Sequence, residues 1–132
     1  MGIISKLLGI CRTQQPDNPD SWNYAGNTIT IDLDKVPELS APGDAARLEG
    51  KGLPQRVLVL QGADNDYHAF INKCAHVGKR RLDPIDNGTR VQCCSVGQSV
   101  FDLSGKRLSG SAKGNITPLT VKKEGATLVI ST

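Results

Sequence analysis

The stretch that most constrains this sequence lies between positions 74 and 101, where two short clusters of metal-binding residue types occur. Cys74 and His76 form the first cluster, and Cys93 and Cys94 begin the second. A glycine follows each cluster within a few residues, as expected for a tight loop. Thiols and imidazoles at the tips of two loops are a common way of holding a metal ion or an iron–sulfur cluster. This stretch therefore predicts two loops that face each other across a candidate metal site.

The second cluster differs from a complete pair of ligands at one position. Val96 stands three residues after Cys93, where a ligand would be expected. Cys94 is an alternative ligand, but adjacent residues of an extended segment point to opposite sides of the chain. We therefore do not expect Cys93 and Cys94 both to face one metal ion.

Length, charge and cysteine spacing narrow the class of protein. The chain has 132 residues, enough for one domain with a single core. Its net charge of +3, with no aromatic residues interleaved in its basic run, argues against nucleic-acid binding. Adjacent cysteines at positions 93 and 94 do not suit the disulfide framework of a small exported domain. We see no secretory signal and no membrane-spanning stretch, so we expect a cytoplasmic location.

Most of the chain carries the alternating apolar and polar pattern of short β-strands. Apolar residues occupy both faces of residues 56–61, so this strand should be a central one. Turn residues separate the predicted strands, and no helix is expected after residue 12, which favours an all-β sandwich or barrel. The predicted strands cover residues 28–33, 45–49, 56–61, 67–72, 89–93, 99–103, 106–108, 120–123 and 127–131.

Residues 1–27 are predicted to form a leader that precedes a domain at residues 28–132. Ile3, Ile4, Leu7 and Leu8 would share one face of a short amphipathic helix within residues 1–12. That helix would pack on its own domain, or lie on a membrane surface or a partner. Residues 13–20 contain two prolines and no periodicity, which is typical of a linker.

The motifs in the second half of the chain resemble the Rieske iron–sulfur family. The resemblance rests on Cys-Ala-His at 74–76, the segment FDLSGKRLSG at 101–110, and Pro-Leu-Thr-Val at 118–121. It extends from about residue 28 to the end of the chain. It implies a stack of antiparallel sheets in which a small cluster-binding subdomain, residues 72–101, is inserted into a larger base.

The resemblance also implies a ligand set for a 2Fe–2S cluster. In that family two cysteines hold one iron and two histidines hold the other, and the neutral histidines raise the reduction potential. The matching positions place the cysteines at Cys74 and Cys93 and the first histidine at His76, whereas the second histidine position holds Val96. The implied activity is one-electron transfer to a redox partner protein. We assign no catalytic residues, and an electron-transfer or accessory role is favoured over an enzyme activity of the domain's own, a question that stays open.

Two other interpretations of the same residues stay open. The domain could be a cluster-free accessory or docking module, in which the thiols stay reduced or Cys74 forms a disulfide with Cys93 or Cys94. Alternatively, these three cysteines and His76 could bind zinc. The basic run Lys79, Arg80 and Arg81 follows the first loop, where the resemblance places the rim that docks redox partners. A basic rim would attract an acidic partner, although a solvated run of charge is the simpler interpretation.

Overall fold

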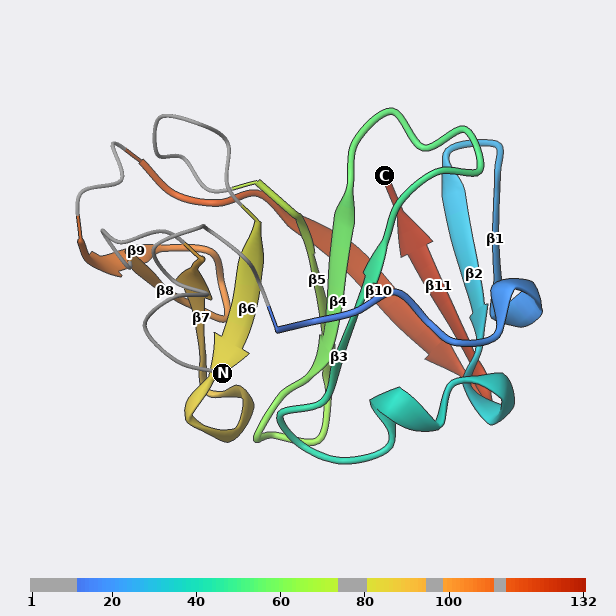
Figure 1. The fold of residues 1–132 in the computed structure, drawn as a ribbon, viewed down its shortest axis with the longest axis horizontal. Helices are drawn as coiled ribbons and strands as arrows, with labels where there is room; N and C mark the ends of the chain where they lie inside the picture. The colour runs from blue at the N-terminus through green and yellow to red at the C-terminus, as the bar shows by residue number, and fades with distance from the viewer. Residues whose placement is uncertain (1–11, 74–80, 95–98, 111–113) are drawn as a thin grey trace.

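The protein is described here by a computed structural model, which covers residues 12–73, 81–94, 99–110 and 114–132. Within these residues the chain forms eleven β-strands and four short 3-10 turns, which confirms the predicted all-β class (Figure 1). The strands are β1 (Trp22–Ala25), β2 (Thr28–Asp32), β3 (Ala45–Leu48), β4 (Val57–Gln61), β5 (Tyr67–Ile71), β6 (Leu82–Ile85), β7 (Arg90–Cys93), β8 (Val100–Asp102), β9 (Arg107–Ser109), β10 (Pro118–Glu124) and β11 (Thr127–Ser131). The turns are η1 (Pro19–Ser21), η2 (Leu33–Lys35), η3 (Pro37–Leu39) and η4 (Asp86–Gly88).

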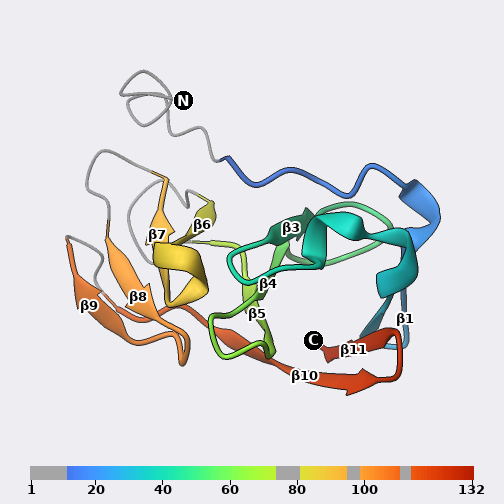
Figure 2. The same cartoon turned by 90° about the horizontal axis from the view of Figure 1, so that it is seen from below.

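The strands form two antiparallel sheets that lie beside each other (Figures 1 and 2). The larger sheet has the order β1-β2-β11-β10-β5-β4-β3, and the smaller sheet has the order β6-β7-β8-β9. Strand β10 joins the two halves of the larger sheet, because Pro118 and Leu119 pair with β5 while the rest of the strand pairs with β11. In the chain, the smaller sheet is an insertion between β5 and β10.

Strand β4 separates two hydrophobic clusters. Its residues are all buried, and they alternate between the two clusters as the strand's pleat requires. Val57 and Val59 belong to the core of the larger sheet, whereas Leu58 and Leu60 pack with Phe70 and residues of the smaller sheet. This burial on both faces confirms that residues 56–61 form an interior strand. Burial of each such aliphatic side chain stabilises the folded state by about 1.5–3 kcal/mol relative to leaving it exposed to water.

Two strands lie where the sequence pattern predicted none. Strand β6 contains Pro84, which interrupts the strand pattern, but β6 is an edge strand that pairs with β7 alone. An edge strand tolerates proline because its outward N–H has no ladder partner to lose. Strand β1 begins at Trp22, inside the predicted leader, and Trp22 is buried beneath the ammonium group of Lys51 at 4.5 Å. The larger sheet therefore starts before residue 28.

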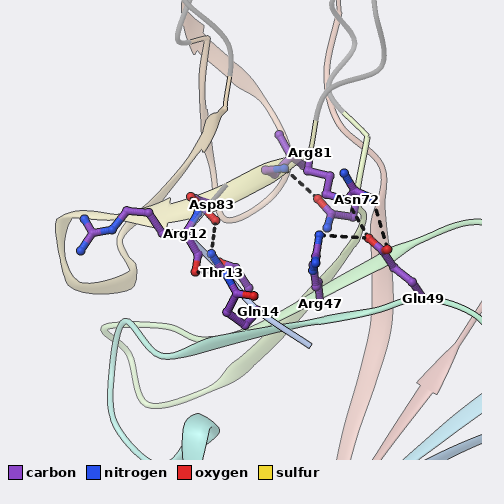
Figure 3. A network of polar contacts seen from close by, with 9 residues as sticks. Arg12, Thr13, Gln14, Arg47, Glu49, Asn72, Arg81 and Asp83 are labelled. Atoms are coloured by element: carbon purple, nitrogen blue, oxygen red, sulfur yellow. Dashed lines mark hydrogen bonds and ion pairs between the residues drawn. The ribbon is translucent and has the colours of Figure 1, made fainter. Parts of the chain in front are cut away.

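The segment that follows residue 11 runs across both sheets. The Gln14 carbonyl accepts a hydrogen bond from the Arg47 amide on β3, at 2.9 Å. The carboxylate of Asp83 on β6 accepts hydrogen bonds from the amides of Arg12 and Thr13, at 2.6 and 2.9 Å (Figure 3). This segment therefore connects the larger sheet to the smaller one. The helix predicted within residues 1–12 lies almost wholly outside the described residues. Among the residues that the structure describes, no helix is long and apolar enough to cross a membrane.

Candidate metal centre

The buried side chain of Asn72 links the two strands that flank the first candidate loop, residues 74–80. Asn72 directly follows β5 and is 1% exposed. Its Oδ1 atom accepts a hydrogen bond of 2.7 Å from the Leu82 amide, at the start of β6. The backbone amide of Asn72 donates a hydrogen bond of 2.8 Å to the Arg56 carbonyl. These bonds fix the end of β5 beside the start of β6, so that the two ends of the loop lie together.

The second candidate loop, residues 95–98, leaves from the strand next to β6. The Cys93 amide donates to the Ser99 carbonyl at 2.8 Å, which closes the base of this loop. The Cys94 amide donates to the Arg81 carbonyl at 3.0 Å, and Leu82 is paired with Cys93 in the β6–β7 ladder. The bases of the two candidate loops are therefore hydrogen-bonded to each other.

The two adjacent cysteines have different surroundings. Cys93, the last residue of β7, is 1% exposed and packs in the cluster that contains Leu82 and Phe101. Cys94 is 8% exposed, does not belong to that cluster, and is disulfide-bonded. The pair therefore follows the alternation expected of an extended segment, in which Cys93 faces the core and Cys94 faces away from it.

The other predicted site residues divide between described and undescribed parts of the chain. Five of them lie outside the described residues: Cys74, His76, Lys79, Arg80 and Val96. Within the described part of the chain, no group of three or more His, Cys, Asp or Glu side chains could hold a metal ion. His68, on β5, lies with its Nε2 atom 3.1 Å from the Asp64 carboxylate.

Arg81, at the end of the first loop, takes part in an ion-pair cluster. Its Nε and Nη2 atoms donate to the Glu49 carboxylate at 2.7 and 3.2 Å, and Arg47 Nη1 lies 3.7 Å from the same carboxylate (Figure 3). The hydrogen bond from Arg81 holds the pKa of Glu49 below its usual value. Burial, followed by repulsion from Arg81, lowers the pKa of Arg56.

Sequence reasoning identified Arg81 but missed Arg47, Glu49 and Arg56. These residues belong to β3, to the turn that follows it, and to the position before β4. Their spacing in the sequence matches no motif, and hydrophobic periodicity does not report on charged side chains. Pairing of β3 with β4 brings the three together, so their proximity follows from the tertiary fold.

Comparison with known proteins finds solved structures of similar fold but no match by sequence. No known protein-family model matches the chain, and no curated protein sequence matches it. Several solved structures do match. The ferredoxin of carbazole 1,9a-dioxygenase from Nocardioides aromaticivorans IC177 is 17% identical with a TM-score of 0.57, covering 77% of this chain and 93% of its own.

Two oxygenase structures match over a smaller part of their own length. A naphthalene 1,2-dioxygenase variant bound to phenanthrene is 21% identical with a TM-score of 0.59, covering 83% of this chain and 26% of its own. A quaternary ammonium Rieske monooxygenase is 19% identical with a TM-score of 0.52, covering 71% of this chain and 28% of its own. This chain thus spans less than a third of the oxygenase chains and most of the ferredoxin.

These likenesses define the class of the domain by its fold. The chain has a Rieske-type fold, in which a larger antiparallel sheet carries a smaller inserted sheet. The identities, at 21% or less, establish the fold alone.

Proposed function

We propose that this chain is a Rieske-type electron-transfer domain that binds a 2Fe–2S cluster and exchanges single electrons with a protein partner. The observation that carries the proposal is the hydrogen bond between Cys94 and Arg81, which places the bases of both candidate loops side by side. The Rieske-type fold supports it, because the matching ferredoxin corresponds to this chain over 93% of its own length.

Three residues are proposed to hold the cluster: Cys74, His76 and Cys94. Cys94 takes the place that the sequence pattern gave to Cys93, because the Cys93 side chain is buried among apolar residues. The disulfide at Cys94 shows that its sulfur meets the sulfur of another cysteine, for which we propose Cys74. Two thiols that can join in a disulfide can, when reduced, approach a single iron atom.

The cluster would supply a centre that gains and loses one electron, and the chain's own residues would control access to it. Cys94 directly follows β7, and its backbone amide donates to the Arg81 carbonyl, which holds it at the base of both loops. The apolar cluster below, with Leu82 and Phe101 fully buried, excludes water from the inner side of the site. Val96 in place of a histidine leaves His76 as the proposed ligand of the outer iron.

A pair of serine variants tests which cysteine serves the cluster. Anaerobic reconstitution of the parent chain should give about two irons and visible absorption. Cys94→Ser should remove most of the bound iron because it removes a proposed ligand. Cys93→Ser should keep the iron, although it places a hydroxyl in the core and lowers stability by about 1–3 kcal/mol. Iron loss in Cys93→Ser together with iron retention in Cys94→Ser would contradict the proposed ligand set.

The disulfide at Cys94 also supports a second candidate function, a cluster-free docking module of the same fold. In that case the proposed disulfide between Cys74 and Cys94 would join the two loops permanently and take the place of a metal. The protein would then be colourless when purified both with and without oxygen. Its Cys94 thiol would react with an alkylating agent after reduction but not before. Stoichiometric zinc in elemental analysis would instead support the zinc-binding interpretation.

The basic run at the end of the first loop is proposed to face the electron-transfer partner. It consists of Lys79, Arg80 and Arg81, of which Arg81 is within the described residues with a side chain 35% exposed. Long basic side chains beside a redox centre would attract an acidic partner and speed its association at low ionic strength.

A further inference from the structure

One buried side chain, that of Asn72, joins the two ends of the first candidate loop. Its Oδ1 atom accepts a hydrogen bond of 2.7 Å from the Leu82 amide, ten positions along the chain. The backbone amide of Asn72 is bonded to the Arg56 carbonyl just before β4, so the side chain projects from a fixed point of the larger sheet. Asn72 is 1% exposed, which shields the bond from competition with water. The position of β6 beside β5 therefore depends on this oxygen atom.

The same bond affects the base of the second candidate loop. Figure 3 shows Asn72 beside Arg81, the residue that precedes β6. The Arg81 carbonyl accepts a hydrogen bond of 3.0 Å from the Cys94 amide. Leu82 is paired with Cys93 in the β6–β7 ladder, and within the described residues no strand pairs with the other edge of β6. A shift of the start of β6 would therefore move the backbone that holds Cys94.

The two polar atoms of the Asn72 amide differ in what they contribute. Oδ1 is bonded to the Leu82 amide, whereas Nδ2 is buried without a hydrogen-bond partner in the described part of the chain. A buried donor without an acceptor destabilises the folded state. The favourable part of this side chain is therefore the acceptor oxygen, and a variant that keeps an oxygen at this place should keep its effect.

We propose that Asn72 is a positioning residue for the candidate metal centre, which aligns the bases of the two loops so that Cys94 meets a second thiol. Cys94 is disulfide-bonded, and a disulfide requires the two cysteines to lie within a narrow range of distances. Deviation from that geometry makes the bond easier to reduce. Loss of the Asn72 acceptor should therefore favour the thiols. That the aligned thiols serve a cluster rests on the proposed function, whereas the alignment of Cys94 does not.

The test measures the Cys94 disulfide in the metal-free whole chain, equilibrated with dithiothreitol. This dithiol gives two electrons and two protons to the disulfide, which becomes two thiols, while the dithiol becomes a cyclic disulfide. Alkylation in denaturant, followed by mass spectrometry, counts the labels on the tryptic peptide of residues 91–106. Cys93 is a thiol, so this peptide carries one label when Cys94 is oxidised and two when it is reduced.

Three variants of Asn72 should differ according to the oxygen that they keep. Asn72→Leu keeps the size of the side chain but leaves the Leu82 amide without its acceptor, so it should favour the reduced state about tenfold. Asn72→Ser, whose oxygen lies closer to the backbone, should shift the equilibrium in the same direction and keeps the test open if Asn72→Leu does not fold. Asn72→Asp keeps an acceptor oxygen in place and should stay within about twofold of the parent chain.

Ser21→Ala is the matched control, because Ser21 is also 1% exposed and its hydroxyl donates to the Asn18 carbonyl. It lies in the turn before β1, across the molecule from β6 (Figure 1). This control should lower stability in urea without shifting the disulfide. Equal shifts in Asn72→Leu and Ser21→Ala, a tenfold shift in Asn72→Asp, or no shift in either Asn72→Leu or Asn72→Ser would overturn the proposal.

Iron content is measured separately, after reconstitution of the same variants. A chain that binds no iron but shows the Asn72→Leu shift would contradict the proposed cluster and support the positioning role. Iron bound by a chain whose disulfide does not respond to Asn72→Leu or Asn72→Ser would overturn the positioning role alone.

Discussion

Glu49 stabilises the fold through its ionised form, because Arg81 donates two hydrogen bonds to its carboxylate. The side chain of Glu49 is 19% exposed, so water screens these contacts less than it would at the surface. The hydrogen bond from Arg81 lowers the pKa of Glu49 in the folded chain. A group with a lowered folded-state pKa binds fewer protons when folded than when unfolded, and its stabilising effect is therefore lost in acid.

This linkage predicts how stability depends on pH. The contribution of Glu49 should be fully present above its ordinary pKa of about 4.5 and should fall as the pH drops through its lower folded-state value. Urea unfolding of the parent chain and of Glu49→Gln should therefore give a stability difference near neutral pH that shrinks below about pH 4. A difference that stays constant across this range would contradict the role given to the Glu49 carboxylate.

At the scale of elements, the turn η4 locks the smaller sheet onto the larger one. Gly88 in this turn has a φ of +85°, and a Cβ atom there would lie 2.7 Å from the Gln61 carbonyl oxygen and 3.0 Å from the Gly43 amide nitrogen. Both contacts are to backbone, which cannot move aside as a flexible side chain can. Close packing of the turn on β4 therefore requires glycine.

Gly88→Ala should consequently destabilise the protein more than its backbone conformation alone explains. Gly52→Ala is the matched control, because Gly52 has a φ of +86° with no atom within 4 Å of an added Cβ. The control should cost about 1–2 kcal/mol from the left-handed backbone conformation. Gly88→Ala should cost about 1–3 kcal/mol more because of the backbone clash. Chemical denaturation measures both, and equal losses would show that the turn does not pack against β4 as described.

At the scale of the whole molecule, the segment after residue 11 holds the two sheets in one arrangement. It is bonded to Arg47 of the larger sheet and to Asp83 of the smaller one. The Asp83 carboxylate accepts both Arg12 and Thr13 amides, and ionised acceptors make the stronger kind of hydrogen bond. The base of the candidate metal centre therefore depends on contacts far away in the sequence.

Asp83→Asn should loosen this segment without unfolding the domain. An asparagine amide has one oxygen in place of two, so one of the two backbone amides loses its acceptor. Trypsin should then cleave after Arg12 about tenfold faster than in the parent chain, since local opening exposes the bond. Asp34→Asn, at an exposed carboxylate on η2, should leave the rate unchanged. Unchanged cleavage in Asp83→Asn would show that Asp83 does not hold the segment.

The sequence predicted the β-strands well where alternation was regular, and it predicted from apolar residues on both faces that β4 is an interior strand. It did not predict β6, because Pro84 interrupts the strand pattern there. It did not predict β1 either, because that strand is short and follows a proline-rich linker. The hydrogen bond between Cys94 and Arg81 and the ion pairs of Arg47 and Arg81 with Glu49 could not be predicted, because strand pairing brings these residues together. The ligands Cys74 and His76 stay predictions from the motif.

The most direct test of the proposed cluster is the iron content of the unmodified chain purified without oxygen, read together with its visible absorption. The neighbouring loop bases and the position of Cys94 outside the hydrophobic cluster predict a red-brown protein with about two irons per chain. Colourless protein without iron, after both anaerobic purification and reconstitution, would contradict it.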